Sequence, residues 1–109
     1  MANYVQFAGT SAANTAQTVS TGTGTRYKVR WITVAYSAAP TQTGVTIALD
    51  SSQGAAYDTD LYTGSANVRY TFWQPDDDFP ILGTDQIDVT APAAGGAITS
   101  SIVIMCEVG

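Results

Sequence analysis

The chain has 109 residues, which fits one domain spanning residues 1–109 with a core modest enough that a partner surface would add stability. Its formal net charge is −5, with four basic against nine acidic residues, so we expect no nucleic-acid partner. The longest apolar run, Ile102–Met105, is far shorter than the roughly 18 residues of a membrane span, and the N-terminus shows no secretory-signal pattern. We therefore expect neither a membrane partner nor a cleaved leader.

The predicted elements are all strands. Thr occurs 16 times and Val nine times, whereas Leu occurs three times and Glu and Lys once each. β-Branched residues suit a pleated surface, while solvated helix faces are normally built from Leu, Glu and Lys. In the first half of the chain the predicted strands are Asn3–Ala8, Ala16–Ser20, Arg26–Ser37 and Gly44–Asp50.

The longest of these strands changes its pattern half-way. Val29 and Trp31 share one face by alternation, whereas Ile32 and Val34 fall on the opposite face. Either the second half of the strand is buried on both faces, or a β-bulge redirects its side chains.

The second half of the chain continues in shorter pieces, and its predicted strands are Tyr57–Thr63, Asn67–Trp73, Phe79–Leu82, Gln86–Ala91 and Ala97–Val108. In the last one, Ile102 and Ile104 share a face while Val103 and Met105 lie opposite, which predicts a central place in a sheet or burial in an interface. About eight short strands at roughly 8–12-residue spacing, separated by Gly, Pro, Asn and Asp, are typical of an antiparallel β-sandwich or barrel.

The composition removes most catalytic chemistry. The chain has no histidine and a single cysteine, Cys106. This excludes Ser-His and Cys-His nucleophile pairs, an intrachain disulfide and a thiolate zinc cluster. There is also no glycine-rich phosphate loop. We expect no enzymatic activity and no cofactor, and we expect Cys106 to be a small apolar residue of the last strand.

Three of the four basic residues are Arg26, Lys28 and Arg30, spaced by two. In a strand this spacing places all three on one face, so they form a candidate partner-binding stripe for an acidic surface. The alternative is an ordinary solvated strand face.

An acidic loop offers a second candidate site. Asp76, Asp77 and Asp78, together with Asp85 and Asp88 near the same hairpin, could supply the oxygen ligands that Ca²⁺ requires. The spacing differs from that of helix-loop-helix calcium sites, so the alternative is a solvated acidic loop without an ion.

Aromatic side chains offer a third candidate site. Exposed rings could form a platform for a sugar, and Trp73 is the best single candidate because alternation places it opposite Phe72. In the alternative, Trp31, Tyr70 and Phe72 belong to the core and Trp73 packs on a neighbouring loop or subunit. The rings considered for the platform are those of Trp31, Trp73, Tyr57, Tyr62 and Tyr70.

The stretch Asp78-Phe79-Pro80-Ile81-Leu82-Gly83-Thr84-Asp85-Gln86-Ile87-Asp88-Val89-Thr90 resembles a hairpin of jelly-roll sandwiches, although Thr84 separates the glycine from the aspartate of the turn. With its Thr/Ala/Gly-rich strands and apolar last strand, the whole chain is similar to small virion proteins of tailed phages, above all capsid decoration (cement) proteins. The resemblance implies a jelly-roll-like β-sandwich that assembles as a homotrimer on the phage particle surface, contacts the major capsid protein or other virion subunits, and has no catalytic function.

Two roles therefore remain open, and an enzyme that uses carboxylates alone is kept as a third only for completeness. The first is a structural virion protein that binds and stabilises the capsid surface. The alternative is a carbohydrate-binding or receptor-binding β-sandwich module, such as a tail-fibre tip or an adhesin-like domain.

Overall fold

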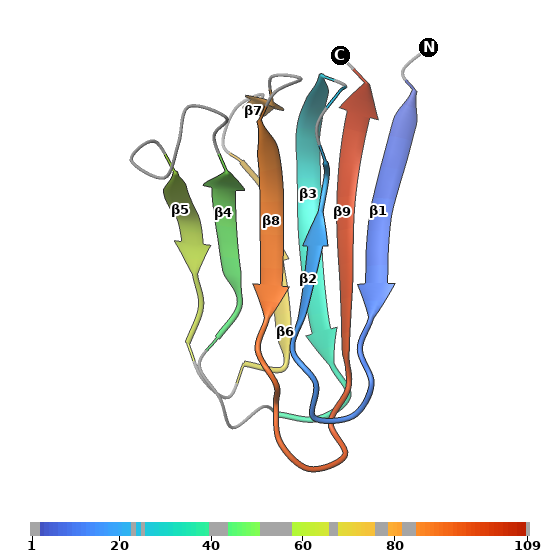
Figure 1. Ribbon diagram of the computed structural model, residues 1–109, viewed down its shortest axis with the longest axis vertical. Helices are drawn as coiled ribbons and strands as arrows, with labels where there is room; N and C mark the ends of the chain where they lie inside the picture. The colour runs from blue at the N-terminus through green and yellow to red at the C-terminus, as the bar shows by residue number, and fades with distance from the viewer. Residues whose placement is uncertain are drawn as a thin grey trace.

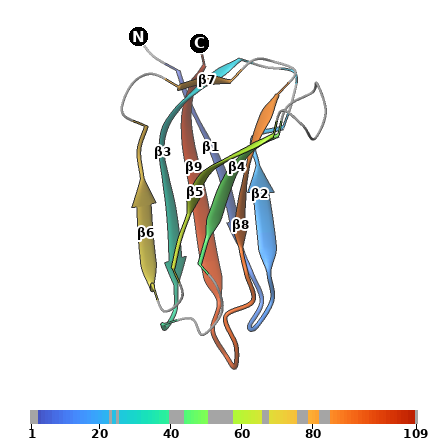
Figure 2. The ribbon, with the colours of Figure 1, turned by 90° about the vertical axis from the view of Figure 1, so that its left-hand side faces the viewer.

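Two antiparallel β-sheets pack face to face in the computed structural model, which describes residues 3–22, 24, 26–39, 44–50, 58–65, 68–75, 79–81 and 85–108 (Figures 1 and 2). The strands are β1 (Tyr4–Thr10), β2 (Gln17–Ser20), β3 (Tyr27–Tyr36), β4 (Thr46–Asp50), β5 (Thr59–Thr63), β6 (Tyr70–Trp73), β7 (Phe79–Ile81), β8 (Gln86–Ala91) and β9 (Ser100–Val108). The described residues contain no helix, and so none long and apolar enough to cross a membrane.

The first sheet has the strand order β1-β9-β3-β6, with β7 pairing with the beginning of β3. The second sheet has the order β2-β8-β4-β5. This arrangement confirms the predicted all-β, jelly-roll-like sandwich. The predicted bounds of β8 are correct, whereas β9 begins three residues later than predicted. The delay has a local cause, because Gly95 and Gly96 adopt positive φ angles of 96° and 52° and hold a turn before the strand.

The core lies between the two sheets. Each sheet turns one face, rich in β-branched side chains, toward the other sheet, as expected from the alternation of apolar and polar residues along the strands. Ile32, Ile47 and Ile104 are fully buried, and β9 lies between β1 and β3, in the central place that its two-sided apolar pattern predicted. The complete set of buried hydrophobic residues is Val29, Ile32, Val34, Tyr36, Val45, Ile47, Ile87, Val89, Ala91, Ala94, Ile102, Ile104 and Cys106.

A β-bulge in β3 explains the change of pattern in this strand. Val29 pairs with Cys106 and Trp31 pairs with Met105, so Arg30 is the additional residue of a bulge in β3. Val29 and Ile32 therefore both face the core, although they are three positions apart. Of the two predicted explanations, the bulge is the correct one. If strict alternation is continued from Val29 through residue 30, every residue of β3 from Trp31 onward is assigned to the wrong face.

Candidate functional site

The outer face of the first sheet carries an open groove. The bulge at Arg30 is its structural origin, because it turns both Arg30 and Trp31 away from the core. The groove has a volume of about 550 Å³, and its lining comes from β1, β3, β9 and the residue after β6. These lining residues are Tyr4, Arg30, Trp31, Gln74 and Met105.

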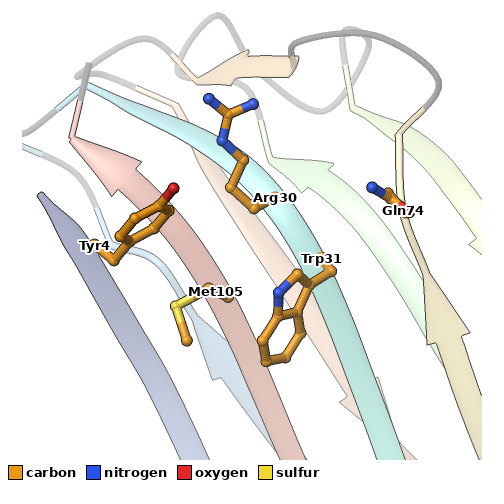
Figure 3. Close-up of a pocket in the computed structure, with 5 residues that line it drawn as sticks. All are labelled: Tyr4, Arg30, Trp31, Gln74 and Met105. Carbon is orange, nitrogen blue, oxygen red and sulfur yellow. The ribbon is translucent and has the colours of Figure 1, made fainter. Parts of the chain in front are cut away.

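Aromatic and apolar groups form the centre of the groove. Figure 3 shows Tyr4 and Gln74 at its two ends, with Trp31 and Met105 between them. Trp31 also stacks with Phe72, at a ring-centroid distance of 6.5 Å and an interplanar angle of 26°. The groove is thus continuous with an exposed aromatic surface on β6, where Tyr70 and Phe72 are 59% and 54% exposed.

The polar edge of the groove is held by an ion pair. The Arg30 Nε–H donates a hydrogen bond of 2.9 Å to Glu107 Oε1, and a terminal guanidinium nitrogen contacts the same oxygen. Both side chains remain partly accessible. The pair fixes the direction of the guanidinium and compensates its charge, so the groove presents oriented donors rather than a net positive field.

The structure places the predicted basic stripe around this ion pair. Arg26 is exposed just before β3, while Lys28 and Arg30 lie on the outer face on either side of buried Val29. Lys28 is opposite Glu107 in the register of β3 with β9. The stripe is therefore interrupted by a carboxylate, which the spacing of the basic residues alone does not reveal. Its role in binding a partner stays a prediction.

The predicted position of Trp73 is wrong. Trp73 pairs with Ile32 and packs against the core, whereas its neighbour Phe72 is exposed. The core alternative is also wrong for Phe72 and for Tyr70. The reason is that β6 has large apolar side chains on both faces, so its orientation is set by its register with β3 beyond the bulge. Trp31, Phe72 and Tyr70 are the rings that the outer face brings together.

The other two rings considered for a platform do not join this surface. Tyr62 is partly buried and packs against the core, and Tyr57 lies outside the described residues.

The predicted calcium loop is only partly described. Asp76, Asp77 and Asp78 lie outside the described residues. Among the residues that are described, no group of three or more carboxylate or thiol side chains is placed to hold a metal ion.

Several acidic groups do act on one another at the end of the second sheet. Desolvation raises the pKa of Asp50, and the nearby carboxylates of Asp58, Asp88 and Asp85 raise it further. Gln86 bridges this group, since its Nε2–H donates to Asp88 Oδ1 at 2.8 Å and to Asp50 Oδ2 at 3.4 Å.

Cys106 is fully buried in β9, as predicted for a small apolar residue of the last strand. Burial raises the pKa of its thiol to about 11. A thiol in this environment is protonated at neutral pH and is a poor nucleophile.

The chain matches no family model and no curated protein. Its fold is similar to that of a chain in the acidic stable capsid of Helicobacter pylori bacteriophage KHP30, with a TM-score of 0.56, 10% identity and coverage of 99% of this chain and 94% of that one. It is also similar to a chain of the cyanophage Pam1 capsid asymmetric unit, with a TM-score of 0.54, 13% identity and coverage of 99% and 86%.

A third similar structure comes from a different class of protein. It is chitosan-binding module 1 of a chitosanase/glucanase from Paenibacillus sp. IK-5, with a TM-score of 0.53, 16% identity and coverage of 94% of this chain and 76% of that one. At these identities the comparisons establish a shared β-sandwich fold, which serves both in phage capsids and in carbohydrate-binding modules.

Proposed function

We propose that the chain is a structural subunit of a tailed-phage particle, a capsid decoration protein that binds the particle surface. The observation that supports this role best is the outer face of the first sheet. Tyr4, Tyr70 and Phe72 are each more than half exposed there, and Trp31 and Met105 lie between them. Contiguous exposed apolar surface on a small domain marks a contact with another protein. In this role the partner is the major capsid protein or another virion subunit.

The proposed role needs no catalytic group and no cofactor, and it places the protein on the virion surface. A subunit of this size gains stability when it binds its neighbours, because binding to the folded form alone shifts the unfolding equilibrium. Self-association is part of the proposal. A count of three copies is implied only by the resemblance to decoration proteins, so the number of copies has to be measured.

The test is quantitative protein analysis of purified virus particles from the culture that produces the chain, followed by electron microscopy of those particles. A decoration subunit is expected in a fixed ratio to the major capsid protein and as density on the outer surface. Its absence from purified particles would contradict the proposal.

Surface variants then test the binding face. Phe72→Lys places a charge on the outer face of the first sheet and is expected to lower occupancy on particles. Thr63→Lys is the matched control, because Thr63 is exposed on β5 of the other sheet. Equal occupancy of the two variants would exclude this face as the attachment surface.

The groove favours carbohydrate binding as a second candidate. Trp31 and Tyr4 offer ring surfaces for the apolar face of a sugar, and Gln74 and the oriented guanidinium of Arg30 offer hydrogen-bond donors for its hydroxyl groups. Glycan titration tests this role, with tryptophan fluorescence as the readout for the wild type and calorimetry for the variants, because Trp31→Ala removes the ring that would report binding. Binding is expected to be lost in Trp31→Ala and retained in Trp73→Phe, whose ring packs against the core. Unchanged fluorescence across a glycan panel would contradict carbohydrate binding, and the structural role would be the only remaining candidate.

A further inference from the structure

The two lateral sides of the sandwich differ in charge. One side is bounded by the edge strands β1 and β2. Both come from the stretch Met1–Thr25, which contains no Asp, Glu, Lys or Arg. The opposite side is bounded by β5 and β6, with Asp60 inside β5 and Asp58 and Arg69 just before these strands. Charges on an edge strand hinder its pairing with another chain, and Asp60 gives β5 this protection. β6 contains no charge but is only four residues long, whereas β1 and β2 have no charged residue within or beside them.

The edge strand β1 is also long and regular. It pairs with β9 over seven residues, from Tyr4 with Glu107 to Thr10 with Ser101, without a bulge and without proline. Bulges, prolines, charges and short length are the usual devices that keep an edge strand single. Within the described part of the chain, no strand pairs with the other edge of β1, which forms one margin of the sheet in Figure 1.

The hydrogen bonds at the ends of β1 show which backbone groups face this open edge. The Val108 N–H donates to the Asn3 carbonyl at 2.9 Å, and the Ser11 N–H donates to the Ser100 carbonyl at 2.9 Å. Residues of an antiparallel strand alternate between those bonded to the partner strand and those whose N–H and C=O point away from it. The backbone N–H and C=O groups of Asn3 and Ser11 therefore point toward β9, and so do those of the odd-numbered residues between them.

The even-numbered residues therefore direct their backbone groups to the open edge. Their side chains are all exposed on the outer face of the sheet. These residues are Tyr4, Gln6, Ala8 and Thr10.

We propose that β1 pairs antiparallel with β1 of a second copy of this chain, about a two-fold axis beside Phe7. This register places Tyr4 opposite Thr10 of the second copy and Gln6 opposite Ala8. All of them are residues with edge-directed backbone groups, so the two strands exchange hydrogen bonds along their whole length and the two first sheets become one. None of the facing side chains is charged, so no like charges meet across the seam.

A second copy is favoured over a strand of another protein because the edge is complementary to itself in both hydrogen bonding and charge. Only one strand of each copy takes part in the seam. The surface that each copy buries there is therefore smaller than the roughly 800 Å² that each partner contributes to a standard interface. We therefore expect a reversible dimer that dissociates in the micromolar range. This inference specifies the self-association that belongs to the proposed virion role. Its test uses the isolated chain, so the dimer can fail while attachment to particles holds, and the reverse.

The first measurement is molar mass by light scattering and sedimentation, from low micromolar to millimolar concentration. The mass is expected to rise from that of one chain, 11.4 kDa, toward twice this value. A single-chain mass throughout, or a mass of three chains, would overturn the proposal.

Two variants at Ala8 locate the contact. Ala8→Pro removes an N–H that points to the open edge and leaves the hydrogen bonds to β9 in place, which an edge strand tolerates. Ala8→Lys adds a charge at the same position and keeps the backbone unchanged. Both are expected to weaken dimerisation at least about tenfold, the effect of roughly 1.4 kcal/mol.

Ser101→Lys is the matched control, because Ser101 is exposed on the same face but lies one strand inward, on β9. It is expected to leave the dimer intact. Circular dichroism confirms that each variant is folded. If the dimer persists in both Ala8 variants, it uses another surface and the proposal is contradicted. The proposal is also contradicted if Ser101→Lys weakens the dimer as much as the Ala8 variants do.

Amide hydrogen exchange gives a second, independent readout. The N–H groups of Gln6, Ala8 and Thr10 are expected to exchange at least about tenfold more slowly at concentrations where the dimer forms. Those of Val5, Phe7 and Gly9 already bond to β9, so their exchange is expected to change little. Equal slowing of both sets, or slowing confined to the second set, would overturn the proposal. Slowing that appears only with another protein present, without self-association, would assign the edge to that partner instead.

Discussion

Arg30 and Glu107 form an ion pair between β3 and β9, although Glu107 is in register with Lys28 rather than with Arg30. The bulge makes this diagonal contact possible, because it places Arg30 as an extra residue on the outer face. The pair then orients the guanidinium at the rim of the groove. One backbone irregularity thus determines both the polar edge of the groove and, through Trp31, its aromatic centre.

A double-mutant cycle with Arg30→Gln and Glu107→Gln tests how strong this pair is. Both side chains are partly accessible, at 34% and 19%. We therefore expect a coupling energy of about 0.2–1 kcal/mol in the free energy of unfolding, decreasing as salt is added. A coupling several times larger and independent of salt would mean that the pair is desolvated, in contradiction with its exposure.

The core makes a sharper prediction. Ile47→Asp and Ile104→Asp are each expected to prevent folding, because both side chains are fully buried. An unpaired buried carboxylate costs several kcal/mol, a large part of the roughly 5–15 kcal/mol that stabilises a domain. Ser101→Asp is the control, since Ser101 is exposed on the same strand as Ile104. Soluble core variants that unfold cooperatively would show that the faces of β4 and β9 are assigned wrongly.

The two tryptophans are expected to contribute differently to stability. Trp73 packs against the core, so Trp73→Ala should lower the free energy of unfolding by about 2–4 kcal/mol. Trp31 stacks with Phe72 on the outer face, and Trp31→Ala should cost only about 0.5–1.5 kcal/mol. Denaturant unfolding of the two variants measures the difference. The reverse order would place Trp31 in the core and remove the centre of the groove.

The fold was accessible from the sequence because most of its strands alternate without interruption. Gln86–Ala91 is an example, since Ile87 and Val89 face the core as a period of two requires. Polar turns separate the strands, and the scarcity of Leu, Glu and Lys leaves no helical alternative. Local pattern was sufficient to predict an antiparallel sandwich.

The groove was not accessible in the same way. It depends on which residues of different strands lie side by side, such as Trp31 and Met105, and no property of a single strand fixes this register. The change of pattern after Trp31 did signal an irregularity, but not its position at Arg30. On β6, apolar residues on both faces left the orientation of Phe72 and Trp73 undetermined until the pairing with β3 was known.

Cys106 gives a prediction for pH dependence. Burial raises the pKa of this thiol from 9.0 to about 11, so the protonated form is favoured in the folded state. The unfolded chain loses this proton near pH 9, and stability is therefore expected to fall as pH rises from about 9 toward 11. Below pH 9 the thiol is protonated in both the folded and the unfolded state, so it contributes no pH dependence to the free energy of unfolding. Burial also raises the pKa of Tyr36, which acts in the same direction.

Cys106→Val separates the two contributions, because it keeps an apolar side chain of similar size and leaves Tyr36 unchanged. Its free energy of unfolding is expected to decline less steeply between pH 9 and pH 11 than that of the wild type. Identical pH profiles of the two proteins would mean that the thiol is solvated in the folded state.

Attachment to the proposed particle is expected to have an electrostatic part carried by Arg26, Lys28 and Arg30. The structure adds a ranking to this prediction, because the charge of Arg30 is already compensated by Glu107, whereas Arg26 is exposed before β3. Arg26→Gln should therefore lower occupancy on particles more than Arg30→Gln, and the triple change to Gln more than either, without unfolding the domain.

Each such contact is weak, about 0.2–1 kcal/mol, but several copies on one particle add their contributions. The Debye length falls from about 10 Å at 0.1 M salt to about 3 Å at 1 M, so release should rise with salt over this range. Occupancy is measured by quantitative protein analysis of particles after washing at each salt concentration. If occupancy is independent of salt and equal in the triple variant, the stripe is an ordinary solvated strand face. Attachment then depends on the apolar outer face, where Phe72→Lys has its effect.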